Sequence, residues 1–197
     1  MSNESIKNTI SLMLITLVAG LLLGVVYEIT KEPIAAEQQR AKEEAYKTVF
    51  AEANTFEEIV LDCTQVEKDL LKQGYSVTIN EAMKVLDKSG NLSGYVLTLT
   101  DHEGYGGDIQ FAMGVKIDGT VNGISFLSIT ETAGLGMKAA EEDFMKQFAD
   151  KKVERFQYTK NGASAEGDID AISGATITTN AVVNGVNAGL YYISTLE

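Results

Sequence analysis

The sequence predicts an α+β fold, in which helices pack on an antiparallel β-sheet and one transmembrane helix precedes the sheet domain. Three observations support this fold class. An uncharged apolar stretch lies near the N-terminus, a series of β-branched and aromatic segments follows, and helical patterns flank that series. The chain has 197 residues, with 18 glycines and one proline, which is enough for one domain of ordinary size plus extra elements.

The apolar stretch has the length of a membrane span. No charged side chain lies between Asn8 and Tyr27, and residues 10–27 read ISLMLITLVAGLLLGVVY. About 20 such residues form a helix of roughly 30 Å, the thickness of a bilayer's hydrocarbon core. A cleaved signal peptide is the alternative, but its apolar region is shorter and ends in a small-x-small site. We therefore expect a short tail over residues 1–7 and a transmembrane helix over 8–28.

The charges that flank the span leave its orientation open. Lys7 precedes it, whereas Lys31, Arg40 and Lys42 follow it. The positive-inside rule, applied literally, leans slightly toward a cytoplasmic domain.

The next segment is expected to be a helical connector over residues 29–50. Residues 34–50 are rich in Ala, Glu, Gln and Lys, which favour a helix. Pro33 would stand near the first turn of that helix, where proline is tolerated.

Four segments then carry the β pattern. They are rich in β-branched and aromatic residues and span 76–86, 92–100, 108–117 and 121–129. Turn residues separate them at 88–91, 104–107 and 118–119, which indicates an antiparallel meander.

Helical patterns return in the C-terminal third. A helix is expected over residues 138–149, a strand over 152–158, and a final helix over 177–195. One face of the final helix would carry four apolar side chains, namely Ala181, Val182, Val186 and Leu190.

The charge balance excludes some partners. The formal net charge is −12, so the surface repels phosphate backbones and we expect no nucleic-acid partner. One cysteine and one histidine exclude an intrachain disulfide and a zinc or iron–sulfur site built from such ligands. Cys63 is expected to be a small buried apolar residue, and His102 a solvated loop residue.

Two segments carry residues suited to binding an anion. Residues 170–176 read DAISGAT and are followed by Ile-Thr-Thr, and residues 131–138 read ETAGLGMK. Both stand at predicted loop-to-helix junctions, where unpaired backbone N–H groups and the positive end of the helix favour a phosphate. Simpler interpretations exist: the first is an ordinary helix cap, and the second a flexible glycine loop before an amphipathic helix.

Together, and behind one anchor helix, the two segments resemble RnfG, the FMN-binding subunit of the Rnf electron-transport complex. In that family D-x-x-S/T-G-A-T is the flavin-attachment signature, and a flavin transferase moves FMN from FAD onto its last Thr as a phosphoester. The resemblance implies covalent FMN on Thr176, with the rest of the signature matched by Asp170, Ser173, Gly174 and Ala175. Thr178 and Thr179 are expected to donate hydrogen bonds to the phosphate.

The second segment resembles a loop near the flavin in the same family, E-T-P-G-L-G. Its matching residues are Glu131, Thr132, Gly134, Leu135 and Gly136. Ala133 stands where Pro is usual, and this departure bears on the rigidity of the loop because Pro mainly pre-sets backbone geometry. The Gly-Tyr-Gly-Gly turn at 104–107 also fits the family.

The resemblance implies an electron relay without substrate turnover of its own. The chain would be a single-pass protein of the cell (inner) membrane, with a covalent-FMN-binding domain over 51–197 on the extracytoplasmic side. Its partners would be the other membrane subunits of an Rnf-type ferredoxin:NAD oxidoreductase coupled to ion transport, and a flavin transferase for maturation.

Three alternatives remain from the sequence. The chain is also similar to NqrC, a subunit of the sodium-pumping NADH:quinone oxidoreductase, although that protein is typically longer. It could instead be a non-redox, membrane-anchored binding module that holds a partner or a small anion. A flavin-dependent sensor or reductase with its own substrate is the third.

Overall fold

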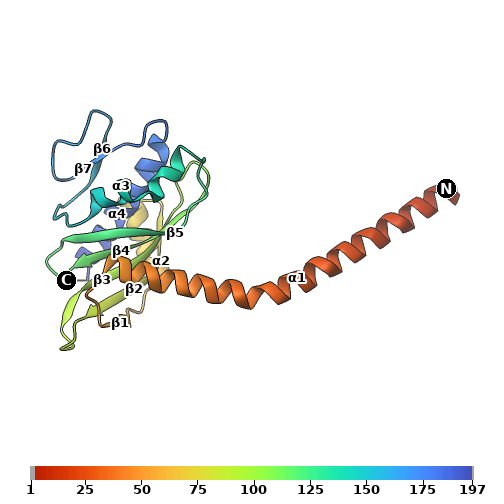
Figure 1. The fold of residues 1–197 in the computed structure, drawn as a ribbon, viewed down its shortest axis with the longest axis horizontal. Helices are drawn as coiled ribbons and strands as arrows, with labels where there is room; N and C mark the ends of the chain where they lie inside the picture. The colour runs from red at the N-terminus through yellow and green to blue at the C-terminus, as the bar shows by residue number, and fades with distance from the viewer. Residues whose placement is uncertain (1–2, 197) are drawn as a thin grey trace. The chain divides into compact units, whose positions relative to one another are not determined.

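A computed structural model describes residues 3–196 and shows an α+β protein with one long N-terminal helix (Figure 1). The chain divides between Ala41 and Lys42 into two compact units. Helix α1, Asn3–Val49, contributes its first part to one unit and its last two turns to the other.

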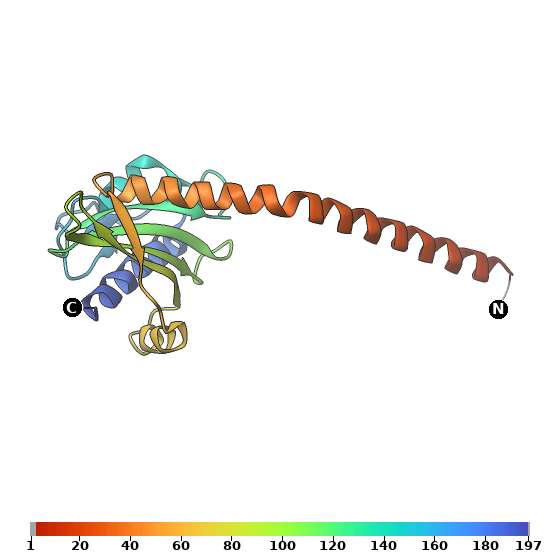
Figure 2. The same cartoon turned by 90° about the horizontal axis from the view of Figure 1, so that it is seen from below.

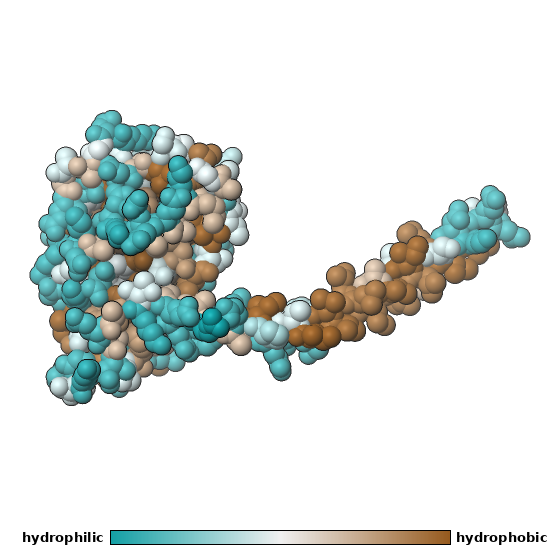
Figure 3. All heavy atoms as spheres, in the orientation of Figure 1, coloured by the Kyte–Doolittle hydropathy of each residue, from teal (hydrophilic) through white to brown (hydrophobic). Residues whose placement is uncertain are grey.

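The first unit is the N-terminal part of α1. Within residues 3–196, α1 is the one helix long and apolar enough to cross a bilayer, and its apolar segment is not buried by protein. Figure 3 shows this segment as a continuous hydrophobic surface. The hydroxyls of Thr16 and Thr30 donate to the carbonyls of Leu12 and Val26, at 3.1 and 2.9 Å, so these polar groups are paired within the helix.

Pro33 lies inside α1 and not near the start of a separate helix, as the sequence had indicated. The helix expected over 34–50 is the last part of this continuous element. Proline removes one backbone hydrogen bond and opposes a helix interior by roughly 3 kcal/mol. Long helix-favouring segments on both sides offset that cost.

The second unit is built on a five-stranded antiparallel sheet in the order β1-β2-β3-β4-β5. Its strands are β1 Thr55–Glu58, β2 Val77–Leu86, β3 Leu92–Asp101, β4 Ile109–Lys116 and β5 Val121–Ser128. The predicted meander is confirmed for the last four strands. The first strand was not predicted, because TFEE is short and largely charged.

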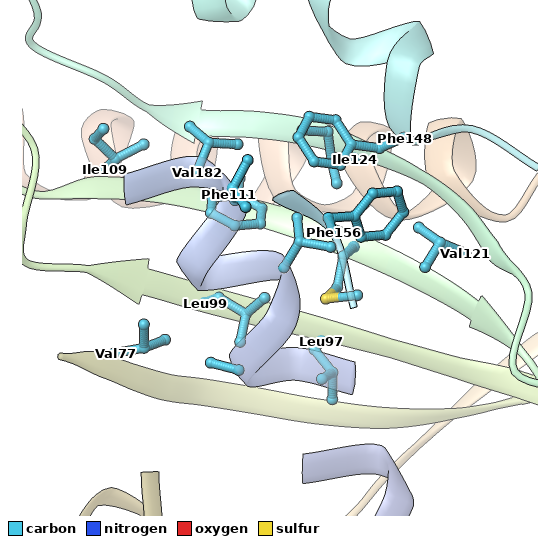
Figure 4. Close-up of a cluster of buried hydrophobic side chains, with 14 of the residues drawn as sticks. Val77, Leu97, Leu99, Ile109, Phe111, Val121, Ile124, Phe148, Phe156 and Val182 are labelled. Atoms are coloured by element: carbon cyan, nitrogen blue, oxygen red, sulfur yellow. The ribbon is translucent and has the colours of Figure 1, made fainter. Parts of the chain in front are cut away.

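Both faces of this sheet are covered (Figures 1 and 2). Helix α4, Thr176–Ser194, packs on one face over a large apolar core, part of which Figure 4 shows. The expected apolar face of this helix is confirmed, since Ala181, Val182 and Val186 are fully buried. The last turns of α1 cover the other face, where Tyr46, Val49 and Phe50 meet residues of the sheet.

A β-bulge in β2 decides which side chains face which helix. Ile79 pairs with Leu99, but Glu81 pairs with Thr98, so Asn80 is the extra residue. Because side chains alternate along a strand, one extra residue reverses the alternation beyond it. Ile79 therefore points into the α4 core, and Glu81 points to the face that α1 covers.

Several smaller elements differ from the sequence predictions. Helix α2, Cys63–Lys72, was not predicted. Its first residue, Cys63, is exposed, so the expectation of a buried cysteine is wrong. Leu70 is the buried residue of this helix, and Cys63 directly follows the capping residue Asp62 at the solvent-facing start. His102 lies in the loop after β3, as expected.

The segment after the sheet is more irregular than predicted. The helix expected over 138–149 is three short pieces, η1 Gly136–Ala140, α3 Glu142–Met145 and η2 Lys146–Phe148. Residues 152–158 do not form the expected strand. Instead β6, Gln157–Thr159, pairs in parallel with β7, Asp168–Asp170. Packing of Phe144, Phe148 and Phe156 against one another overrides the local pattern here.

Candidate functional site

The two segments that the sequence singled out lie side by side. Gly174 has a φ of +78°, a conformation that favours glycine, and a Cβ there would stand 3.1 Å from the Leu135 side chain. Gly136 lies between the two segments: a Cβ on it would stand 2.7 Å from both Glu131 Oε2 and Thr178 Oγ1. These glycines allow the loop at 131–136 to approach the start of α4.

A cavity of about 520 Å³ opens where the segments meet. This volume is within the range of small-molecule sites. The residues that line it come from three places in the chain, which are Tyr105; Glu131, Thr132, Leu135 and Gly136; and Gly174, Ala175, Thr176, Ile177 and Thr178.

Thr176 is the first residue of α4, at a helix start that no side chain caps. The N-cap residue is Ala175, which has no polar side chain, and the first backbone bond of the helix runs from Thr179 N to Ala175 O. The N–H groups of the three residues before Thr179 have no intrahelical acceptor. The helix therefore presents its positive end and its free donors at the cavity.

The other hydroxyls predicted in this segment have different positions. Thr179 is fully buried; its Oγ1 accepts from Ile172 N at 3.1 Å and donates to Ala175 O at 3.0 Å. Ser173 is exposed and does not line the cavity. Thr178 is 1% exposed and lines the cavity. Thr179 thus fastens the loop, while Thr176 and Thr178 face the space in front of it.

Asp170 and Gly134 lie outside the cavity lining. Asp170 ends β7, where its Oδ1 accepts from Ala163 N at 2.5 Å and its N–H donates to Gln147 Oε1 at 2.6 Å. These bonds fix the strand that leads into residues 171–176. Gly134 has a φ of +76° and forms the turn of the second loop.

Glu131 is a buried carboxylate at the cavity wall. It is 8% exposed, and its Oε1 accepts a 3.1 Å hydrogen bond from Gly106 N. Its Oε2 is buried and has no hydrogen-bond partner among the described residues. An unpaired buried oxygen is costly, so a ligand that donates to it would gain binding energy there.

Two cavity residues, Tyr105 and Ile177, were not among the predicted site residues. Tyr105 is 70% exposed and lies in the Gly-Tyr-Gly-Gly turn that the sequence had marked only as a turn. Ile177 is 53% exposed at the second position of α4. An exposed aromatic residue between glycines was the available signal. Together with Leu135, these side chains form an apolar rim that suits a flat ring.

The loop that carries Tyr105 is held by two buried carboxylates. Glu131 binds Gly106, and Asp101 Oδ1 accepts from Glu103 N at 2.7 Å. Asp101 is fully buried, and its Oδ2 has no partner among the described residues. Burial, and to a lesser degree the nearby carboxylates of Glu103 and Asp108, raise the pKa of Asp101 to about 7.

Comparison with known proteins gives two family models and a set of relatives. Residues 104–191 match the model of an FMN-binding domain, and residues 1–49 match the model of the RnfG N-terminal region. The chain is 34% identical, over all of its length and 98% of the relative, to the G-type subunit of the ion-translocating oxidoreductase complex of Methanosarcina acetivorans.

Two further relatives carry more specific names. One, 29% identical over 98% of this chain and 94% of its own, is the G-type subunit of the proton-translocating ferredoxin:NAD(+) oxidoreductase complex of Clostridium ljungdahlii. The other, 28% identical over 94% and 90%, is the G-type subunit of the Na(+)-translocating complex of Acetobacterium woodii. Among solved structures, NqrC of Shewanella oneidensis has a TM-score of 0.47 and 22% identity, covering 58% of this chain and 61% of that one.

The cavity lies within the segment that matches the FMN-binding domain, and the long apolar helix lies within the segment that matches the N-terminal region. The identity to the Methanosarcina protein extends over both. This chain belongs to the RnfG family, the G-type subunits of ion-translocating oxidoreductase complexes.

Proposed function

We propose that this chain is a membrane-anchored electron-transfer subunit of an Rnf-type ferredoxin:NAD oxidoreductase, with FMN attached to Thr176 through a phosphoester. The observation that carries the proposal is the placement of Thr176. It is the first residue of an uncapped 19-residue helix, and it opens into a cavity of about 520 Å³ within the FMN-binding segment.

The residues present fit such a group. The phosphodiester retains one negative charge, which the free N–H groups and the positive end of α4 would offset. Gly174 lets the backbone turn sharply just before the attachment point. The apolar side chains of Tyr105, Leu135 and Ile177 stand at the rim, where they could cover a ring face.

The predicted site residues take distinct roles in this proposal. Thr176 is the attachment residue, Thr178 and Gly136 line the floor, and Glu131, Thr132 and Leu135 form the facing wall. Ala175 leaves the helix start uncapped. Three others hold the loops in place, namely Asp170, Thr179 and Gly134.

Attachment requires a flavin transferase that uses FAD. The oxygen of Thr176 would form a bond to the FMN phosphorus, the pyrophosphate bond of FAD would break, and AMP would leave. Thr176 is half-buried at the cavity, so its hydroxyl is accessible to such an enzyme.

A tethered flavin suits a relay between partner subunits. The flavin supplies the exchange of one or two electrons, whereas the protein supplies position and electrostatics. The cavity is open and its rim residues are exposed, so noncovalent contacts alone hold a ligand weakly. A covalent tether keeps the local concentration high even when those contacts break.

The relatives support the assignment of the complex but leave the coupling ion open. The Clostridium protein is named for proton transport and the Acetobacterium protein for sodium transport, at nearly equal identity to this chain. We propose the shared reaction, electron transfer between ferredoxin and NAD coupled to ion transport, and the other membrane subunits as partners.

Coexpression with a flavin transferase tests the attachment. We expect the intact mass of the full chain to rise by one FMN residue, and the denatured protein to remain fluorescent on a gel. Thr176→Ala should abolish both signals, because Thr176 carries the hydroxyl that stands at the helix start and faces the cavity. Ser173→Ala, which removes an exposed hydroxyl three residues away, is the matched control and should stay labelled.

Two results would contradict this proposal. Persistent fluorescence in Thr176→Ala would defeat the residue assignment. A wild-type chain at its bare mass, despite an active transferase, would favour a non-redox binding module with the same anchor.

We further propose that the flavin domain lies on the extracytoplasmic side of the cell membrane, as the resemblance to RnfG implies. The single cysteine provides a test, since Cys63 is exposed in the second unit. A membrane-impermeant maleimide added to right-side-out vesicles should label Cys63. A Cys63→Ser chain with Asn3→Cys at the opposite end of the span should be labelled only after lysis. The reverse pattern would place the domain in the cytoplasm.

A further inference from the structure

The unpaired oxygen of Glu131 is the strongest unexplained feature near the site. Glu131 is more than nine-tenths buried, it lines the cavity, and one of its two carboxylate oxygens already accepts from Gly106 N. The other, Oε2, has no partner among residues 3–196. A carboxylate kept in this position at a cost in folding energy is a site for a hydrogen-bond donor.

A second oxygen faces the same point in space. Glu131 Oε2 and Thr178 Oγ1 both lie 2.7 Å from the position that a Cβ on Gly136 would take. Gly136 has no side chain, so this point stays free. The Thr178 side chain is buried at the cavity and makes no hydrogen bond within the part of the chain that the structure describes. The two oxygens therefore form a small polar floor in an otherwise apolar cavity.

We propose that Glu131 and Thr178 bind a hydroxyl of the ribityl chain of the flavin nucleotide. This inference rests on the proposed attachment of FMN at Thr176. In FMN the phosphate is followed directly by the polyol chain, and the ring comes last. Thr178 stands two residues after Thr176 in the first turn of α4, so the polar floor lies close to the attachment point.

The chemistry of the floor also selects a hydroxyl. A carboxylate only accepts, whereas a threonine hydroxyl both donates and accepts. A ligand hydroxyl can donate to Glu131 Oε2 and exchange a second bond with Thr178. The ring N–H of a flavin only donates and lies at the far end of the ring from the phosphate. Gly136 is required because any side chain there would occupy the position of the ligand hydroxyl.

The floor also links the ligand to the loop over the cavity. Glu131 uses its other oxygen to hold Gly106, next to Tyr105. The polyol and Tyr105 are thus placed by opposite oxygens of one carboxylate. Glu131 acts on the ligand directly and on Tyr105 as a positioning residue.

Comparison of two free flavins tests the proposal. Riboflavin carries the ribityl hydroxyls without the phosphate, and lumiflavin has the same ring with a methyl group in place of the polyol. The full chain in detergent, expressed without a transferase, is titrated with each and followed by flavin fluorescence anisotropy, with empty micelles as the blank. We expect the wild type to bind riboflavin about tenfold more tightly than lumiflavin, as one hydrogen bond to a charged group provides.

Two substitutions should reduce that preference without changing the loops. Glu131→Gln keeps an amide oxygen for Gly106 N but removes the charged acceptor, and Thr178→Val removes the hydroxyl while keeping the shape. In each we expect the riboflavin preference to fall to about threefold or less, with lumiflavin affinity unchanged. Glu103→Gln, an exposed carboxylate on the same loop, is the matched control and should retain the preference. An equal loss of both flavins would indicate a purely structural role and overturn the proposal.

The outcome is separable from that of the attachment test. If the wild type does not distinguish the two flavins, or binds neither, the hydroxyl site is wrong even when Thr176 carries FMN. If Thr176 stays unmodified beside an active transferase, the proposed function fails, whatever the preference for riboflavin.

Discussion

The two faces of the sheet are covered by helices that differ in how they treat buried polar groups. The α4 face has a large apolar core, and at its end lies Asp101, with one carboxylate oxygen unpaired. On the other face, the last turns of α1 cover a small apolar cluster. There the Tyr46 hydroxyl donates to Glu81 Oε2 and accepts from Thr98 Oγ1, both at 2.8 Å, and Lys42 Nζ also binds Glu81 at 2.8 Å.

The difference separates a face built for stability from one that carries a site. The polar group at the centre of the α1 face is fully paired, so it fixes the helix on the sheet at little cost. The α4 face buries Asp101 beside Gly185, where the two backbones approach closely, and keeps an unpaired oxygen. That carboxylate holds the loop of Tyr105 above the cavity. Unpaired polar groups thus gather on the face whose helix begins at the ligand site.

The largest expected effect concerns the pH dependence of stability at Asp101. The pKa of Asp101 is raised to about 7, above its unfolded value of about 4. The folded chain therefore binds more protons between these values, and stability must fall as pH rises from about 4 to about 7. Relative to Asp101→Asn, the wild type should lose up to roughly 4 kcal/mol over that interval and show a constant difference above it.

Thermal unfolding of the full chain in detergent, followed by near-UV circular dichroism at several pH values, measures this difference. Asp143→Asn, at an exposed carboxylate, is the control and should give a curve parallel to that of the wild type. Parallel curves for Asp101→Asn as well would mean that the buried carboxylate is solvated or paired in solution, and the contrast between the faces would disappear.

A smaller effect is expected for Tyr46→Phe on the opposite face. The substitution removes one hydroxyl and leaves Glu81 and the buried Thr98 each without a partner. We expect a loss of about 1–3 kcal/mol in unfolding free energy, since each unpaired buried group carries its desolvation cost. Attachment of FMN at Thr176 should be unaffected, because the site lies on the other face.

The matched control is Tyr95→Phe, a buried tyrosine whose hydroxyl has no hydrogen bond in residues 3–196. Denaturant unfolding of both variants should show the loss for Tyr46 alone. Equal stability of the two variants would show that the network around Glu81 contributes nothing, and that apolar contact alone holds α1 on the sheet.

Much of the fold could be predicted from local patterns. The apolar stretch, the four strands and the final helix each depend on residues that are close in sequence, such as the buried positions Ala181, Val182 and Val186. The strand β1 and the helix α2 were missed because their patterns are short and polar. The segment between η1 and β7 was mispredicted because aromatic packing among Phe144, Phe148 and Phe156 decides its course.

The site was predictable only in part. The segments at 131–136 and 170–176 were recognisable because they resemble a family, and Thr176 stands where that resemblance indicates. Tyr105 and Ile177 were missed because no local pattern shows which exposed apolar residues border a cavity. The sequence likewise could not tell that Thr179 bonds the loop backbone while Thr178 faces the cavity.

The sequence alone determined the anchor, the order of the strands and the attachment motif, because each depends on contiguous residues and on the periodicity of helix and strand. The tertiary structure alone decided the bulge at Asn80, the meeting of three distant segments around the cavity, and the unpaired oxygens of Asp101 and Glu131. These features arise from packing between elements far apart in the chain, and the cost of burying a polar group depends on neighbours that only the folded chain brings together.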